Sequence, residues 1–296
     1  MKIVVTGSLG NISQPLTQEL VAAGHAVTVV SSKTDKQAAI EALGATAAIG
    51  ALEDSKFLTD TFGGAEAVYC MIPPNFATPD SRAYYRAIGS SYVQAIERSG
   101  VQRVVHLSSW GADLDKGTGF ILGSHDVENM LNQLPDVALT HLRAGYLYYN
   151  LNNYIGMIKG QGIVGSNYGG EAGIVMVAPA DIAAAAAEEL TTPAAPGPRV
   201  RYVASDERTP NEIARVLGAA IGKPDLKWVA FGDAQMQAAL EQRGMPAPAV
   251  ASMIALGSSI RSGALRQDYD QHHPHALGKI KLEDFAREFA AAYQRA

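Results

Sequence analysis

The chain has 296 residues, of which 47% are hydrophobic, and it carries a formal net charge of −5 at pH 7. This length and apolar content predict a globular protein with one large unit and a smaller appended region. A nucleic-acid surface needs clustered Lys and Arg, which this acidic sequence does not show, so that function class is excluded.

The sequence predicts neither export nor membrane insertion. No charged and then apolar leader precedes the first predicted strand, and no apolar run approaches about 18 residues. The single cysteine, Cys70, lies among apolar residues that predict a buried strand. We therefore expect a cytoplasmic protein in a reducing compartment.

The first predicted element is a buried strand, residues 3–5, that leads into a glycine turn and a helix at 11–23. Gly7 and Gly10 permit a tight turn, and the N–H groups and dipole at the helix start favour a pyrophosphate. A side chain at Gly10 is expected to intrude on that pyrophosphate and to require an unfavourable backbone angle. Ser13 takes the third glycine position, where a small residue serves packing. A plain strand-to-helix connection is the alternative.

Strands alternate with helices along the next part of the chain. This alternation predicts parallel βαβ units with right-handed crossovers, and hence an α/β fold with a doubly wound Rossmann sheet. We predict strands at 26–30, 67–72, 103–107 and 137–142, and helices at 35–43, 52–62, 82–99, 125–134 and 181–190. Short apolar stretches lie at 45–49 and 174–177, and the second of these is expected to help complete the sheet.

A linker is predicted at the Pro-rich stretch 192–198, beyond which the alternation becomes irregular. Helices are expected there at 211–221, 233–243, 250–257 and 282–295. These features predict a smaller, mostly helical C-terminal substrate domain. The dinucleotide-binding domain would then contain residues 1–153 and 174–200, and the smaller substrate or cap domain residues 154–173 and 201–296.

The end of the second predicted strand bears on the choice of cofactor. In dinucleotide-binding folds an acidic residue about 20 positions beyond the glycines selects NAD. Ser31, Ser32 and Lys33 occupy that place here, and two hydroxyls with an ammonium suit a 2′-phosphate. NADP(H) is therefore favoured over NAD(H). NAD(H) is the alternative if the loop turns back and brings Asp35 to the ribose. For Lys33, the alternative is an ordinary solvated loop lysine.

Six motifs follow one another along most of the chain: residues 5–12, 50–54, 106–109, 128–131, 142–146 with Asn150, and 180–183. In this order and spacing the chain resembles the NmrA-like family of atypical short-chain dehydrogenases/reductases, and within it members that resemble NAD(P)H:quinone oxidoreductases. One departure is Ala51, which stands where the first Asp of the family's Gly-Asp-x-x-Asp turn usually stands.

The resemblance implies where NADP(H) would bind. The pyrophosphate would lie on the glycine turn and helix start, at Gly7, Leu9, Gly10, Asn11 and Ile12. Ser32 and Lys33 would face the 2′-phosphate. Further along, the residues expected to line the cofactor are Leu52, Met71, Ile72 and Pro73, with Gly145 and Tyr146 near the nicotinamide.

The usual catalytic pair of short-chain dehydrogenases is missing. Alignment on Glu128 puts Phe120 and Ser124 at the Tyr and Lys positions of Tyr-x-x-x-Lys. Reducing an isolated ketone requires a proton donor, whereas a quinone delocalises the incoming charge and can be protonated from water. The candidate catalytic residues are Ser109, His125 and Tyr146. A polar residue at a helix start is the favoured alternative for His125. The candidate substrate-binding residues are Trp110, Phe120, Tyr149 and Asn150.

Three other groups of residues are candidates for a functional site: the C-terminal histidines, the serines and a cluster of tyrosines. His272, His273 and His275 lack a Cys, Asp or Glu partner at ligand spacing, so no metal site is expected. The sequence contains no Gly-x-Ser-x-Gly elbow, so a serine hydrolase is not expected. A group of tyrosines offers either core packing or a stacking surface for a planar substrate, and the two are weighed evenly: Tyr146, Tyr148, Tyr149 and Tyr154.

Two functions fit these observations. The first is an oxidoreductase that transfers hydride from NADPH to a quinone or a similar small planar acceptor. The alternative is a catalytically weak NADP(H)-sensing regulatory protein that acts through a protein partner. Neither nucleic acid nor membrane is an expected partner.

Overall fold

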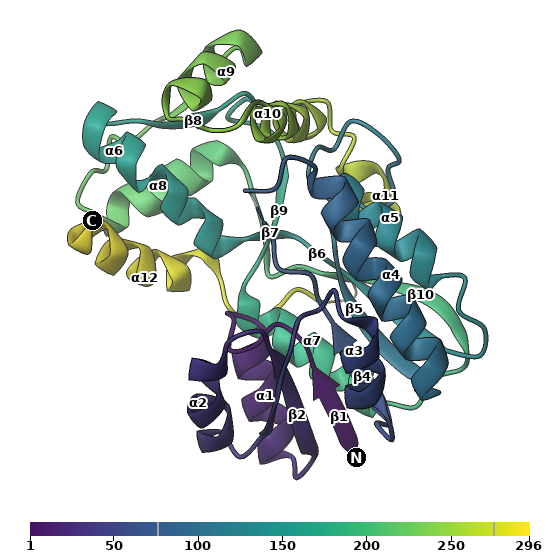
Figure 1. The fold of residues 1–296 in the computed structure, drawn as a ribbon. Coiled ribbons are helices and arrows are strands. Elements are labelled where there is room, and N and C mark those ends of the chain that lie inside the picture. Colours follow the sequence, from purple (N-terminus) through teal and green to yellow (C-terminus); the bar gives the residue numbers. More distant parts are fainter. Residues whose placement is uncertain (76, 275) are drawn as a thin grey trace. The chain divides into compact units, whose positions relative to one another are not determined.

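The computed structural model describes residues 1–75, 77–274 and 276–296, which form two compact units (Figure 1). The first, which we name the sheet unit, consists of Met1–Ser109, Gly123–Arg143 and Ile182–Arg201. The second, the mixed unit, consists of Trp110–Leu122, Ala144–Asp181 and Tyr202–Ala296. The domain boundaries predicted from the sequence stay a prediction.

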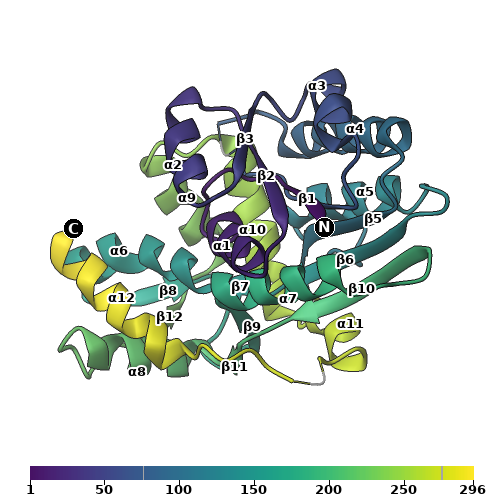
Figure 2. The ribbon, with the colours of Figure 1, turned by 90° about the horizontal axis from the view of Figure 1, so that it is seen from below.

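A seven-stranded sheet of order β10-β6-β5-β4-β1-β2-β3 forms the centre of the sheet unit (Figure 2). Its strands are β1 (Lys2–Val5), β2 (Ala26–Ser31), β3 (Thr46–Ile49), β4 (Ala67–Cys70), β5 (Arg103–Ser109), β6 (Ala138–Ala144) and β10 (Gly197–Val203). The helices that flank this sheet are α1 (Ser13–Ala22), the 3-10 turn η1 (Thr34–Lys36) with α2 (Gln37–Ala42), α3 (Ser55–Phe62), α4 (Ser81–Ser99), α5 (Ile121–Leu131) and α7 (Pro179–Thr191).

The strand pairing fixes where a ligand can approach this sheet. Strand β1 pairs in parallel with β2 on one side and β4 on the other, so that Val4 lies beside both Thr28 and Val68. The pairs β2–β3 and β4–β5 are parallel as well. The carboxyl ends of these strands therefore meet at one edge, and the strand order reverses beside β1, which is where open α/β sheets bind ligands. The predicted α/β class is confirmed.

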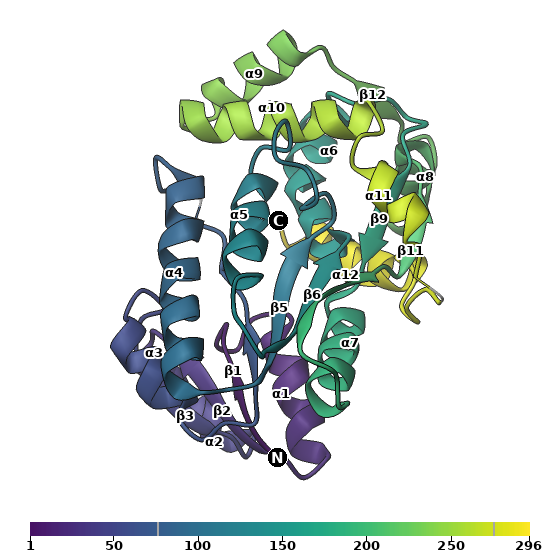
Figure 3. The same ribbon diagram turned by 90° about the vertical axis from the view of Figure 1, so that its right-hand side faces the viewer.

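Helices cover both faces of the sheet: α4 and α5 lie on one face, and α1 and α7 on the other (Figure 3). Strand residues such as Val68 and Val104 form a buried core with Ile88 and Tyr92 of α4. Cys70 belongs to this core, so its predicted burial in a strand is confirmed. Because burial disfavours the charged thiolate, it raises the pKa of Cys70.

The mixed unit contains two small sheets, of order β11-β9-β7 and β12-β8, surrounded by helices (Figure 1). Tyr148 stacks on Phe285 in its core, with ring centroids 5.6 Å apart. The strands are β7 (Tyr146–Leu147), β8 (Val164–Ser166), β9 (Ile174–Val177), β11 (Asp206–Arg208) and β12 (Trp228–Ala230). The helices are η2 (Tyr148–Tyr154), α6 (Ile155–Gln161), α8 (Pro210–Ala220), α9 (Asp233–Gln242), α10 (Ala247–Arg261), α11 (Arg266–Gln271) and α12 (Leu282–Arg295).

Two predictions of local structure are corrected here. The linker predicted at 192–198 is wrong at its end, because β10 begins at Gly197. The helix predicted at 125–134 instead runs from Ile121 to Leu131. The described residues include no helix that is both long enough and apolar enough to cross a membrane.

Candidate functional site

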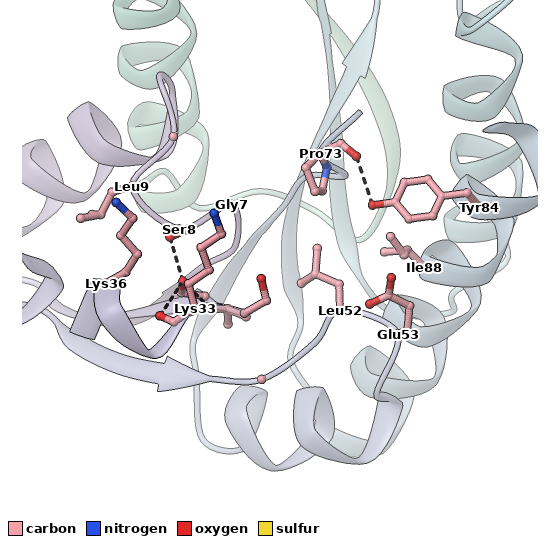
Figure 4. Close-up of a pocket in the computed structure, with 15 residues that line it drawn as sticks. Gly7, Ser8, Leu9, Lys33, Lys36, Leu52, Glu53, Pro73, Tyr84 and Ile88 are labelled. Atoms are coloured by element: carbon pink, nitrogen blue, oxygen red, sulfur yellow. Dashed lines mark hydrogen bonds between the residues drawn. The ribbon is translucent and has the colours of Figure 1, made fainter. Parts of the chain in front are cut away.

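A pocket of about 370 Å³ lies in the sheet unit at the edge where β1, β2, β3 and β4 end (Figure 4). Five separate stretches of sequence reach it, four at the ends of β1 to β4 and one from α4. The lining residues are Gly7, Ser8, Leu9, Gly10, Val30, Ser31, Ser32, Lys33, Lys36, Gly50, Leu52, Glu53, Pro73, Tyr84 and Ile88.

The glycine turn after β1 is held by a backbone conformation that needs glycine at Gly7. Its φ is +95°, and a Cβ there would lie 2.5 Å from the Ser13 Oγ and 2.8 Å from the Met71 Cγ. The buried Ser13 hydroxyl donates to the Thr6 carbonyl at 2.8 Å and so ties α1 to the end of β1. The unfavourable angle predicted at Gly10 is wrong, because the positive φ values in this turn belong to Gly7 and Ser8.

Gly10 nevertheless leaves the pocket side of the turn open. A Cβ at Gly10 would meet the Gly7 carbonyl oxygen at 3.1 Å and no other atom within 4 Å. The turn therefore tolerates a small side chain at this position, but a ligand that approaches the backbone would not. This arrangement fits the close approach of a phosphate to the helix start.

Two lysines stand on one side of the pocket, at the end of β2. Figure 4 shows Lys33 and Lys36 beside Ser8 and the glycine turn. Across the described ranges neither lysine forms an ion pair, so both ammonium groups can meet an anionic ligand. Lys36 was not predicted from the sequence as a site residue. The 3-10 turn over residues 34–36 brings it onto the side of Lys33.

The serines after β2 have different surroundings. Ser31 is buried, and its hydroxyl accepts from the Ser8 hydroxyl at 2.9 Å and from the Lys33 N–H at 3.2 Å. These bonds join the glycine turn to the β2 end, which is a positioning role. Ser32 is exposed and lines the pocket. Asp35 is exposed and is not among the lining residues.

The opposite side of the pocket is largely apolar. Leu52 follows β3, Pro73 follows β4, and Tyr84 and Ile88 come from α4 (Figure 4). The Tyr84 hydroxyl donates to the Pro73 carbonyl at 3.2 Å, which fixes the ring against the pocket wall. Glu53 is the one carboxylate among the lining residues.

Four of the predicted cofactor residues lie near the pocket in the chain but do not line it. Asn11 is exposed, Ile12 is buried at the start of α1, and Ile72 is buried after β4. The Met71 N–H donates to the Thr6 hydroxyl at 2.8 Å, and the Met71 side chain lies against Gly7. Their predicted contacts with a cofactor stay predictions.

Near Ser109, a buried ion pair joins β5, β6 and α5. The Arg143 guanidinium donates to both carboxylate oxygens of Glu128, at 3.1 and 2.7 Å, and the Ser108 hydroxyl donates to the same carboxylate at 2.5 Å. Burial by itself raises the pKa of Glu128, but the hydrogen bonds from Arg143 and Ser108, together with nearby positive charge, outweigh burial and lower it. Ser109 is partly exposed at the end of β5.

Two buried histidines lie in the same part of the sheet. The Nδ1 atoms of His106 and His141 are 3.0 Å apart, and Nε2 of His141 lies 2.9 Å from the Asn132 side-chain oxygen. Burial, followed by the charge of His141, lowers the pKa of His106 to about 3. Burial lowers the pKa of His141 to about 4. His125 is partly exposed on α5, with Nε2 2.9 Å from the Asn129 amide.

The remaining candidates belong to the mixed unit. Tyr146 in β7 shares a hydrogen bond with Tyr154, whose hydroxyl lies 3.4 Å from that of Tyr168. Burial raises the pKa of all three tyrosines. Gly145 is tightly packed, since a Cβ there would lie 2.8 Å from the Val175 carbonyl oxygen. Trp110 is buried, and three candidates are partly exposed: Phe120, Tyr149 and Asn150.

The histidine-rich segment carries no arrangement for a metal in the described residues. Among these residues, no group of three or more His, Cys, Asp or Glu is placed to hold an ion. Nε2 of His273 lies 2.6 Å from the Glu207 carboxylate, and Nδ1 of His272 lies 3.0 Å from the Asp268 carbonyl oxygen. His275 lies outside the described residues.

The pocket fits a phosphorylated dinucleotide in its chemistry. Open backbone at Gly10 suits a pyrophosphate, two lysines suit a further phosphate, and the wall of Leu52 and Ile88 suits a flat base.

The chain is similar to several known proteins. The model of the NmrA-like family matches residues 1–276. An NAD(P)H azoreductase from Xenophilus azovorans is 26% identical over 246 residues, which cover 82% of each chain.

Solved structures show the same fold. A triphenylmethane reductase from Citrobacter sp. has a TM-score of 0.80 and 18% identity, covering 98% of this chain and 100% of its own. An NADPH-dependent quinone oxidoreductase from Escherichia coli, complexed with NADPH, has a TM-score of 0.74 and 22% identity, covering 97% and 99%.

Proposed function

The chain belongs to the NmrA-like family, and we propose that it is an oxidoreductase that transfers hydride from NADPH to a quinone or a similar planar acceptor. The observation that supports this proposal most is the pocket at the carboxyl ends of β1 to β4. Its two lysines lie on one side, and Glu53, the one carboxylate among the lining residues, lies on the other, which suits a 2′-phosphate at the lysines (Figure 4).

Each part of the pocket would hold one part of NADPH. The turn at Gly7 and Gly10 would present backbone N–H groups to the pyrophosphate, and Lys33 and Lys36 would hold the 2′-phosphate. The apolar wall would pack against the adenine. When bound, NADPH supplies a hydride from its nicotinamide ring. These residues bind and orient the cofactor and take no part in the chemical step.

The choice of acceptor follows from what the chain lacks at the usual catalytic positions. Phe120 and Ser124 replace the proton-donating Tyr and its Lys, so an acceptor that spreads the incoming charge over a conjugated system is favoured. The names of three relatives refer to azo, triphenylmethane or quinone reduction. All three compound classes are conjugated, which supports an acceptor that can spread the incoming charge.

The residues expected around the acceptor are proposals that rest on the family resemblance. Gly145 and Tyr146 are proposed to lie beside the nicotinamide, and Trp110, Phe120, Tyr149 and Asn150 beside the acceptor. Replacing Tyr146 with Ala should lower the rate of NADPH oxidation by the acceptor while the affinity for NADP⁺ changes little.

Titration of the purified chain with NADPH, NADP⁺, NADH and NAD⁺ tests the proposed cofactor. The phosphorylated pair should bind at least tenfold more tightly, the scale of one charge-assisted hydrogen bond. Equal affinities for the phosphorylated and unphosphorylated pairs would contradict the preference. NADPH binding without turnover on any quinone would instead favour a nucleotide sensor, whose protein partner must change the NADPH affinity by the same factor as NADPH changes the partner's affinity.

A further inference from the structure

We propose that Glu53 selects the adenine base of the dinucleotide by accepting a hydrogen bond from the exocyclic amino group. This inference rests on the proposed function, since it assumes that NADPH occupies the pocket of the sheet unit. It concerns the side of the pocket formed by residues 50–54, where the chain departs from the family's Gly-Asp-x-x-Asp turn. Ala51 stands there in place of an Asp, and Ala51 does not line the pocket.

The charges of the pocket are divided between its two sides. Lys33 and Lys36 stand beside the glycine turn, while Glu53 stands on the other side with Leu52 and Ile88 (Figure 4). A dinucleotide that places its phosphates at the lysines therefore brings its base toward the apolar wall and Glu53. An ionised carboxylate only accepts hydrogen bonds, so this side requires a donor on the base.

The backbone of Glu53 is held in place from both sides. The Ser91 hydroxyl of α4 donates to the Glu53 carbonyl at 3.0 Å. The next residue, Asp54, caps α3 by accepting from the Phe57 N–H at 2.9 Å. On the other side, the Phe57 ring packs so closely over Gly50 that a Cβ there would lie 2.6 Å from it.

The carboxylate itself remains available for a ligand. Within the described part of the chain, the Glu53 side chain forms neither a hydrogen bond nor an ion pair. Tyr84, which also lines the pocket, donates its hydroxyl to the Pro73 carbonyl instead. Burial, and then the negative charge of Glu53, raise the pKa of Tyr84, which agrees with a carboxylate close to this ring.

The chemistry of the purine separates the possible bases. Adenine carries an amino donor at its 6-position, whereas hypoxanthine and guanine carry a carbonyl acceptor there. A carboxylate at this position accepts from adenine and repels the carbonyl. An uncharged side chain without a donor or acceptor would not distinguish the two bases by hydrogen bonding.

The test compares NADPH with its hypoxanthine analogue, nicotinamide hypoxanthine dinucleotide phosphate, by equilibrium titration. The natural chain should bind NADPH about tenfold more tightly than the analogue, and Glu53→Ala should reduce this ratio to about one. Glu53→Gln is the sharper variant, because an amide both donates and accepts. It should bind the analogue better than Glu53→Ala does. Asp35→Ala, which removes an exposed carboxylate outside the pocket, is the control and should keep the natural ratio.

The outcomes separate this inference from the proposed function. Suppose that the natural chain and Glu53→Ala both bind NADPH tightly and with the same base preference. That result would overturn the role of Glu53, but the proposal that NADPH is the cofactor would still stand. Failure of the natural chain to bind NADPH would overturn both. A tenfold preference that Glu53→Ala removes and Asp35→Ala keeps would support both.

Discussion

Lys33 and Lys36 supply positive charge on one side of the pocket. Replacing either with Ala should weaken NADPH binding by about 1.5 kcal/mol, or about tenfold, because one charge-assisted contact with the 2′-phosphate is lost. NADH affinity should change little, since NADH lacks that phosphate. Calorimetric titration of both nucleotides measures the two effects, with Lys56→Ala as a control on an exposed helix of the same unit. Equal losses for NADPH and NADH would rule out this contact.

Gly7 and Gly10 differ in what a side chain at each would disturb. Gly7→Ala places a Cβ at a φ of +95° and against Ser13 and Met71, so it should destabilise the fold by about 2 kcal/mol. Gly10→Ala meets only the Gly7 carbonyl and should unfold near the natural temperature. Its side chain should instead weaken NADPH binding. Thermal unfolding and nucleotide titration of both variants measure the contrast, and normal NADPH binding by a folded Gly10→Ala protein would contradict it.

At the scale of elements, β5, β6 and α5 are joined by the buried contact of Glu128 with Arg143 and Ser108. Glu128→Ala should lower the free energy of unfolding by about 3 to 5 kcal/mol, because it leaves the Arg143 charge buried without its partner. Asp60→Ala, which removes the exposed pair with Lys56, should cost less than about 1 kcal/mol. Urea denaturation measures both, and similar losses in the two variants would show that the buried pair is not critical.

The histidine pair between β5 and β6 makes stability depend on pH. The pKa of His106 is lowered to about 3 and that of His141 to about 4, so both are neutral in the folded chain at pH 7. The unfolded chain takes up protons near pH 6.5, where the folded chain does not. This contribution to stability is therefore complete above about pH 6.5 and falls as the pH is lowered toward 4, by about 1 kcal/mol per histidine and pH unit.

Replacing both histidines with Gln should flatten that dependence between pH 6.5 and pH 4. Denaturation at a series of pH values measures the slope, and His25→Gln, at a partly exposed position, is the control. A double variant with the natural slope would show that other groups cause the dependence. The ionised Glu128 carboxylate also contributes to the stability of the fold. This contribution is lost in a lower pH range, because the pKa of Glu128 lies below its ordinary value.

For the whole molecule, the sequence predicts the sheet unit well and the mixed unit less well. The strands β1 to β5 are apolar runs separated by helices with glycine ends, and that local alternation is sufficient for the Rossmann class. Strands such as β7 and β12 have two or three residues and exist through pairing with distant segments. So short a run has no period to detect.

The residues of the pocket also differ in how well the sequence predicts them. Lys33 follows a strand at the expected distance from the glycines, so its role can be predicted from position. Lys36 and Glu53 reach the pocket through a 3-10 turn and a helix cap, whose geometry no spacing rule specifies. Their places in the pocket could therefore be seen only in the structure.

Oxidation of NADPH by a panel of small quinones tests the central claim, hydride transfer from NADPH to a planar acceptor, most directly. The account predicts saturable, enzyme-dependent oxidation of NADPH that is slower with NADH at equal concentration, and poor activity on simple ketones because Phe120 cannot donate a proton. Tight NADPH binding with no oxidation above the uncatalysed rate by any quinone, azo dye or triphenylmethane dye would contradict the claim.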